Sequence, residues 1–439
     1  MTSLKKQIFA SVVPPWLWFW LIIYLISLPT NFSNWIRRFM DIFTYQNPSS
    51  DITGSPFYAL LGITDFFEFI FPITLLIGTV SLLFPNQTAK KYEKQQNLKV
   101  RAIQPEIIKF LHKYAPRIHV RFSLKSNKNL ANVYTLDYGK VAIAIFVEMV
   151  KLWQKDQPTA KATLLHELGH YLSGDAFIIG AGSEFRKIVS NWFYLYLLIV
   201  FIPIVIVYLS QTVTFFQEIT QAGIGILPGV THKISQIFIR GIPFFVVLLG
   251  QMLMQLLLTI NVFIIPLIGI WCAEFNADQA VARNASPAEA LKLIHLLSEK
   301  ISWTKWLLSR LTHPPKRLRL WLVTQSHNWW SLFLLLLLFP GAYIVRLFMM
   351  IVYGIIASFM RGNFEALHEA IINYLKNVTL VWIFTAILLA IWPAVSQYWQ
   401  YYLSGIKSSP NQDISWIYYL SAATVATGVL IMRSLIGNG

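Results

Sequence analysis

Long apolar runs separated by polar stretches dominate the chain. A run of about 20 apolar residues predicts a membrane-spanning helix, because such a helix satisfies its own backbone hydrogen bonds inside lipid. Seven runs are predicted to span: 10–28, 66–84, 189–209, 244–272, 329–358, 378–395 and 415–432. Pro340 and Gly341 interrupt the run at 329–358, so it is expected to form either one kinked span or two short elements.

Two polar segments between these spans carry their own secondary-structure patterns. In the first, "QPEIIKFLHKYAP" has apolar residues at helical spacing and "IHVRFSL" alternates like a strand. The stretch "NVYTLDYGKVAIAI" predicts a β-hairpin that turns near Asp137 to Gly139. The chain therefore divides into five predicted parts: 1–84 with two spans, polar 85–188, a membrane hairpin at 189–272, polar 273–328, and membrane segments at 329–439.

The composition supports a multi-pass integral membrane protein. Hydrophobic residues make up 56% of the chain and charged residues 13%, too few to cover a soluble surface of this size. The net charge of +16 is concentrated in the polar segments, and the positive-inside rule places both of them and the N-terminus in the cytoplasm, in a plasma or inner membrane. No nucleic-acid-binding signature accompanies this charge, so the expected partner is the anionic bilayer and not nucleic acid. The only cysteine, Cys272, excludes an intrachain disulfide and a cysteine-based zinc cluster.

The stretch "TLLHELGHYLSGD" in the first polar segment predicts a metal site. On a helix, His166 and His170 share one face and can bind the same ion, and Glu167 lies where it can reach an ion-bound water. This pattern predicts one Zn²⁺ per chain, with Glu167 as the general base of a hydrolysis. The alternative is two histidines on a cytoplasmic helix that binds no metal.

A third ligand is expected from "WCAEFNADQAVAR". A catalytic zinc usually has three protein ligands and a water, and Glu274 stands at the end of a predicted span. Asp278 follows one helical turn later, where a carboxylate can orient a ligand histidine. If 189–272 crosses the membrane and returns, Glu274 reaches the same membrane face as His166. The alternative is the charged end of a helix that leaves the membrane.

The stretches "HELGHYLSGD", "EFNAD" and "THPPKRLRL" occur in this order and resemble the HtpX-like membrane zinc peptidases. That gluzincin superfamily also contains the type-I CAAX prenyl proteases. The resemblance covers roughly 98–325 and implies an α-helical polytopic membrane protein with a cytoplasmic α+β zincin-like catalytic domain that contains a small β-sheet. The catalytic parts would be 85–188 and 273–328. The three C-terminal hydrophobic segments are not usual in the HtpX-like proteins, so the subfamily stays open.

The resemblance also implies roles for residues outside the ligand set. Asn132, in the stretch like the family's substrate-binding edge strand, would bind a peptide backbone, although Val133 stands where a smaller alanine is common. His313 and Arg319 would lie near the active site, where either can stabilise an oxyanion. Their alternative is a turn at the Pro-Pro pair and a basic cytoplasmic face. Asp175 also matches the family pattern.

Together these features predict an integral membrane zinc endopeptidase that acts on membrane-associated peptides or proteins, in membrane protein quality control. A CAAX-type processing protease is the enzymatic alternative. A non-catalytic membrane scaffold of the same fold is another, although the presence of Glu167 argues against it. A transporter is favoured only if polar residues in the spans line one path. The pattern makes no prediction for the oligomeric state.

Overall fold

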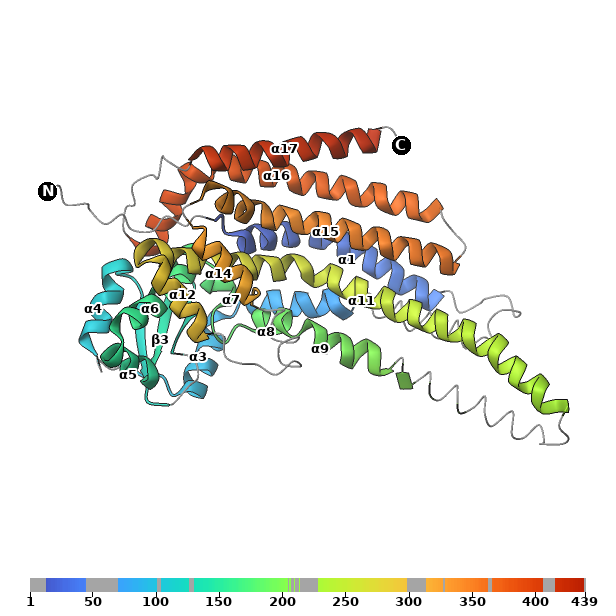
Figure 1. Cartoon of the computed structure of the whole chain (residues 1–439), viewed down its shortest axis with the longest axis horizontal. Coiled ribbons are helices and arrows are strands. Elements are labelled where there is room, and N and C mark those ends of the chain that lie inside the picture. The colour runs from blue at the N-terminus through green and yellow to red at the C-terminus, as the bar shows by residue number, and fades with distance from the viewer. Residues whose placement is uncertain are drawn as a thin grey trace.

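The computed structural model is mostly helical, with a small β-sheet at one end of a bundle of long helices (Figure 1). The structure describes residues 13–44, 70–100, 104–125, 130–203, 228–297, 313–326, 328–361, 365–405 and 415–437, with isolated positions from 205 to 213. Residues 45–69 and 214–227 lie outside the described residues.

Within the described residues, four helices are long and apolar enough to cross a membrane, which is compatible with a membrane protein. They are Met252–Asn284, Trp329–Ile356, Ile371–Ser404 and Ser415–Gly437. A fifth is present if the helix Ile70–Ser81 and α3 (Pro85–Gln96), bent by 85° at their junction, form one span. The predicted spans at 10–28 and 189–209 coincide with shorter apolar helices, Trp16–Pro29 and Trp192–Phe201.

The long helices lie side by side along the molecule (Figure 1). They are α1 (Trp16–Thr44), α11 (Pro228–Asn284), α15 (Trp329–Arg361), α16 (Glu365–Ser404) and α17 (Ser415–Gly437). Of the two alternatives for 329–358, the structure has one helix, α15, which contains Pro340. The 57-residue α11 does not end with its apolar run at 272 but continues without interruption to Asn284.

The sheet confirms the predicted strand and hairpin. Its strands are β1 (His119–Ser123), β2 (Ala131–Asp137) and β3 (Lys140–Phe146), in the order β1-β3-β2. β3 pairs in parallel with β1 and antiparallel with β2. The hairpin turns at Gly139, whose φ of 70° suits a residue without a Cβ. β2 consequently forms an edge of the sheet.

Shorter helices surround the sheet and connect it to the bundle. The predicted helix at "QPEIIKFLHKYAP" is confirmed as α4 (Pro105–Tyr114). The others are α5 (Val147–Lys155), α6 (Gln157–Ser173), α7 (Ala176–Ile179), α8 (Glu184–Ser190), α9 (Trp192–Tyr196), the π-helix η1 (Leu197–Phe201), α12 (Pro287–Leu297) and α14 (Lys316–Thr324).

The C-terminal end of α6 is held by two distant membrane-side helices. The Trp18 indole of α1 donates to the Gly174 carbonyl at 2.9 Å, and the Trp399 indole of α16 donates to the Ser173 carbonyl at 3.0 Å. The Tyr171 hydroxyl donates to the carbonyl of Leu403 at 2.5 Å. These bonds satisfy carbonyls that a helix end leaves without intrahelical partners, and they fix α6 against the bundle.

The two helices α6 and α11 cross in close contact at Gly169. A Cβ built on Gly169 would lie 2.8 Å from Ala277 Cα and 3.3 Å from Ala280 Cβ. Because the nearest atom is backbone, a side chain there must push the helices apart. This close approach brings the polar part of α11 against the histidine-bearing face of α6.

Replacing Gly169 with alanine should therefore destabilise the fold by about 1–3 kcal/mol, the usual cost of overpacking a core. The midpoint of thermal unfolding in detergent measures this. Gly341→Ala is the matched control, because a Cβ there meets no atom within 4 Å and a helical alanine is favoured over glycine. Equal midpoints for the wild type and Gly169→Ala would contradict the packing argument.

Candidate metal centre

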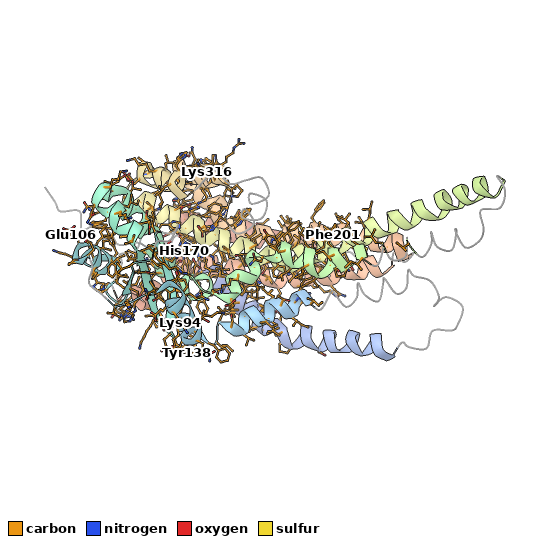
Figure 2. All side chains as sticks on the ribbon, turned by 90° about the horizontal axis from the view of Figure 1, so that it is seen from below. Lys94, Glu106, Tyr138, His170, Phe201 and Lys316 are labelled. Atoms are coloured by element: carbon orange, nitrogen blue, oxygen red, sulfur yellow. The ribbon has the colours of Figure 1, made fainter. Side chains whose placement is uncertain are left out.

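α6 carries His166, Glu167 and His170, and His170 follows one helical turn after His166. The helix starts where the Asp156 side chain accepts from the backbone N–H of Thr159, and it ends at Gly174, whose φ is 80°. Leu164, Leu165 and Leu168 are buried in the core beside the sheet and fix the rotation of the helix. His170 lies inside the end of the molecule that carries the sheet (Figure 2).

α11 brings Glu274 to the two histidines. Its carboxylate lies 3.7 Å from His166 Nε2 and 3.9 Å from His170 Nε2, and the three ligand atoms are within 4.8 Å of one another. A tetrahedral zinc with ligands at about 2.0–2.1 Å separates them by about 3.3–3.4 Å, so a small closure suffices. The three residues predicted as ligands from two stretches of sequence thus form a group that can hold a metal ion.

The two imidazoles are suited to donate a lone pair. Burial lowers the pKa of His170 to about 3, which keeps the ring neutral. The Nδ1 atom of each histidine is buried and has no hydrogen-bond partner among the described residues. His166 Nδ1 nevertheless lies 3.1 Å from Asp278 Oδ1, which places a carboxylate behind this ring as predicted for Asp278.

Arg319 is held by Asp278 and does not point freely into the site. Its Nε and one terminal nitrogen each donate to the Asp278 carboxylate at 2.7 Å, and that terminal nitrogen lies 3.8 Å from Glu274. Arg319 is 7% exposed and Asp278 is 2% exposed, so this is a buried two-pronged ion pair. Arg319 therefore binds Asp278 directly and also lies near Glu274, and its use as an oxyanion donor stays a prediction.

Glu167 contacts the edge strand of the sheet. The backbone N–H of Val133 donates to Glu167 Oε2 at 2.8 Å. Burial raises the pKa of Glu167 to about 6, despite the opposing effects of His166 and of this hydrogen bond. A carboxylate with a pKa close to neutral is suited to accept and release a proton.

Two further side chains bring nitrogen atoms close to Glu274. His313 Nδ1 lies 3.2 Å from Glu274 Oε1, so the structure brings this predicted residue to the ligands. Arg186 of α8 lies 3.9 Å from the same oxygen and was not predicted. No spacing in the sequence marks Arg186, because its position depends on how the chain turns after α6.

Asn132 and Asp175 have other partners in this structure. The Asn132 side chain donates to the Tyr92 hydroxyl at 3.1 Å, on the face of β2 opposite to Val133. Its predicted contact with a peptide backbone stays a prediction. Asp175 accepts from the Ser173 hydroxyl at 2.5 Å, and burial raises its pKa to about 7. It follows the end of α6 and contacts none of the three ligands by a described hydrogen bond or ion pair.

No protein-family model, curated protein or solved structure matches the chain. The centre is therefore defined by its geometry alone. The imidazoles of His166 and His170 and the carboxylate of Glu274 form the group, and the carboxylate of Glu167 is next to His166 in α6.

Proposed function

We propose that the chain is a membrane zinc endopeptidase. The observation that carries this proposal is the convergence of His166, His170 and Glu274 next to the carboxylate of Glu167. Two nitrogen ligands and one oxygen ligand suit zinc, and three protein ligands leave a fourth position for water or substrate. When bound, zinc would polarise the scissile carbonyl and lower the pKa of water.

The chain's own residues would supply the proton transfers. Glu167 would accept the proton of the attacking water and pass it to the leaving amine, which its raised pKa favours. Asp278 would hold the His166 ring, and Arg319 would hold Asp278. His313, with a half-exposed side chain 3.2 Å from Glu274, is the best placed of the predicted donors to reach a substrate oxygen.

The position of the centre supports substrates at the membrane surface. Glu274 lies near the end of α11, beyond its apolar run, so the site would open where the bundle leaves lipid. By the positive-inside rule, the basic polar segments would put it on the cytoplasmic side. Unfolded or damaged membrane-associated chains are the proposed substrates, in agreement with the resemblance to HtpX-like peptidases.

A metal-removal experiment tests this proposal. The protein in detergent should cleave an unmodified unfolded polypeptide with zinc, lose the activity with a chelator, and regain it with added zinc. Failure to cleave any unfolded or farnesylated peptide with zinc bound would count against an enzyme. Preference for the farnesylated peptide would indicate CAAX-type processing.

Replacing Glu274 with glutamine should weaken zinc binding by more than about 100-fold. Loss of a residue that merely orients a ligand typically costs about 10–100-fold, and here a ligand itself loses its charge. Metal analysis after dialysis against limiting zinc measures the effect. Glu289→Gln is the matched control, since this partly buried carboxylate of α12 pairs with Lys292 and is not one of the three proposed ligands. Full zinc retention by Glu274→Gln would exclude the proposed ligand set.

A further inference from the structure

The outer edge of β2 is already occupied at Val133. β2 pairs with β3 on one side only, and the backbone groups of Val133 point away from β3. Its N–H donates to Glu167 at 2.8 Å, and its carbonyl accepts from the backbone N–H of Ala181 at 2.7 Å. An added peptide strand would need these same two groups.

The segment that supplies Ala181, residues Gly180–Ser183 between α7 and α8, lies tightly against β2. A Cβ on Gly180 would lie 3.0 Å from Tyr134 Cα and 3.2 Å from the Val133 oxygen, as well as 2.4 Å from the Ala176 oxygen. Gly182 has a φ of 85°, and a Cβ there would meet the Tyr92 ring. Only very small residues fit along this part of the strand.

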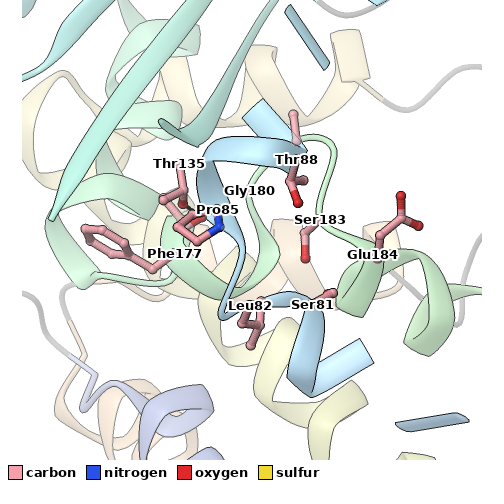
Figure 3. A pocket seen from close by; sticks show the side chains of 11 residues that line it. Ser81, Leu82, Pro85, Thr88, Thr135, Phe177, Gly180, Ser183 and Glu184 are labelled. Atoms are coloured by element: carbon pink, nitrogen blue, oxygen red, sulfur yellow. Dashed lines mark hydrogen bonds between the residues drawn. The ribbon is translucent and has the colours of Figure 1, made fainter. Parts of the chain in front are cut away.

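On its other side the segment borders a pocket (Figure 3). The pocket encloses about 340 Å³ of space, part of it open to solvent. Gly180, Ala181 and Ser183 form one part of its lining. Thr135 of β2 forms another, the bend before α3 supplies Leu82, and the start of α3 supplies Pro85 and Thr88. The segment is therefore packed against β2 and also borders a pocket that is open to solvent.

We propose that Gly180–Ala181–Gly182 holds the place of a substrate backbone on β2, and that this edge selects extended peptides with glycine or alanine where Gly180 lies. The inference rests on the proposed endopeptidase function and specifies its substrate class. A peptide that pairs with Val133 replaces the Ala181 N–H with its own. Its carbonyl takes the Val133 N–H, and Glu167 is released for the reaction.

A peptide series tests the selectivity. Decapeptides that carry glycine, alanine, valine or leucine at one position, scanned along an otherwise constant sequence, are compared by kcat/KM. At one position, the glycine and alanine peptides should be at least about tenfold better than the leucine peptide. If the leucine peptide has the same kcat/KM as the glycine and alanine peptides at every scanned position, the proposed selectivity is overturned.

A pair of variants tests the occupancy. Ala181→Pro removes the N–H that binds Val133, and Ala181→Ser keeps it. Losing one neutral hydrogen bond changes an equilibrium constant by about two- to tenfold. The KM of Ala181→Pro should therefore be lower than that of the wild type by this factor, with kcat nearly unchanged. Ala181→Ser keeps the hydrogen bond and should have the KM of the wild type. An unchanged or higher KM in a zinc-loaded, folded Ala181→Pro protein would overturn the inference.

Hydrogen exchange gives a readout that needs no turnover and no folded proline variant. The Ala181 amide should exchange slowly in the free protein. In Glu167→Gln saturated with the glycine decapeptide, it should exchange at least about tenfold faster. A peptide-saturated protein in which this amide stays protected, or a protein that binds no peptide, overturns the inference.

If the wild type cleaves peptides while the amide stays protected, the proposed function survives alone. If peptides bind and expose the amide but none is cleaved, only the function fails.

Discussion

Replacing Glu167 with glutamine should lower the rate of peptide hydrolysis by about 10²–10⁴-fold while the protein keeps its zinc. The amide cannot accept the proton of the attacking water, and general-base catalysis contributes an effect of this size. Zinc is expected to remain, because the ligand atoms belong to His166, His170 and Glu274. The kcat and the bound zinc are measured on the same preparation.

The Glu289→Gln variant serves again as the control and should retain the wild-type rate. A Glu167→Gln protein that hydrolyses peptides at the wild-type rate would remove Glu167 from the mechanism. Absence of zinc from both the variant and the wild type would instead favour the non-catalytic scaffold.

Replacing Arg319 with methionine should destabilise the protein by about 3–5 kcal/mol. The substitution leaves the Asp278 carboxylate buried without its two-pronged partner, and an uncompensated buried charge has a cost of this size. Adding Asp278→Asn should recover much of this stability, because the pair is then removed as a whole. The free energy of unfolding is measured in denaturant for each single variant and for the double variant.

Zinc affinity should not recover with stability in the double variant. Asp278 also stands 3.1 Å behind His166, and losing a group that orients a ligand weakens metal binding by about 10–100-fold. Arg317→Met is the matched control on α14, since Arg317 is exposed. Stability and zinc affinity that return together would mean that Asp278 serves the ion pair alone.

Local periodicity predicted the parts of the site that lie within single elements. The i, i+4 spacing placed His166 and His170 on one face, and the alternation around Gly139 located the hairpin that supplies Val133. Contacts between elements could not be predicted in this way. The hydrogen bond from Ala181 to Val133 depends on the turn after α7, which the local pattern does not specify.

The end of the predicted span at 272 shows a limit of hydropathy. Glu274, Asn276, Asp278 and Gln279 lower the local hydropathy and suggest that the chain there meets water. In the structure the side chains of all four residues are buried, and α11 continues through them to Asn284. Polar residues that serve a site resemble a solvent-exposed segment in sequence, because hydropathy cannot tell which partner satisfies them.

The indole bonds at the C-terminal end of α6 have a consequence for the order in which the protein matures. Trp18 is made early, but Trp399 and Leu403 are translated more than 220 residues after Ser173 and Tyr171. A nascent chain can contain His166, His170 and Glu274 while the end of α6 still lacks these late partners. Synthesis itself would thus delay completion of the candidate metal centre until the following apolar helices have been made.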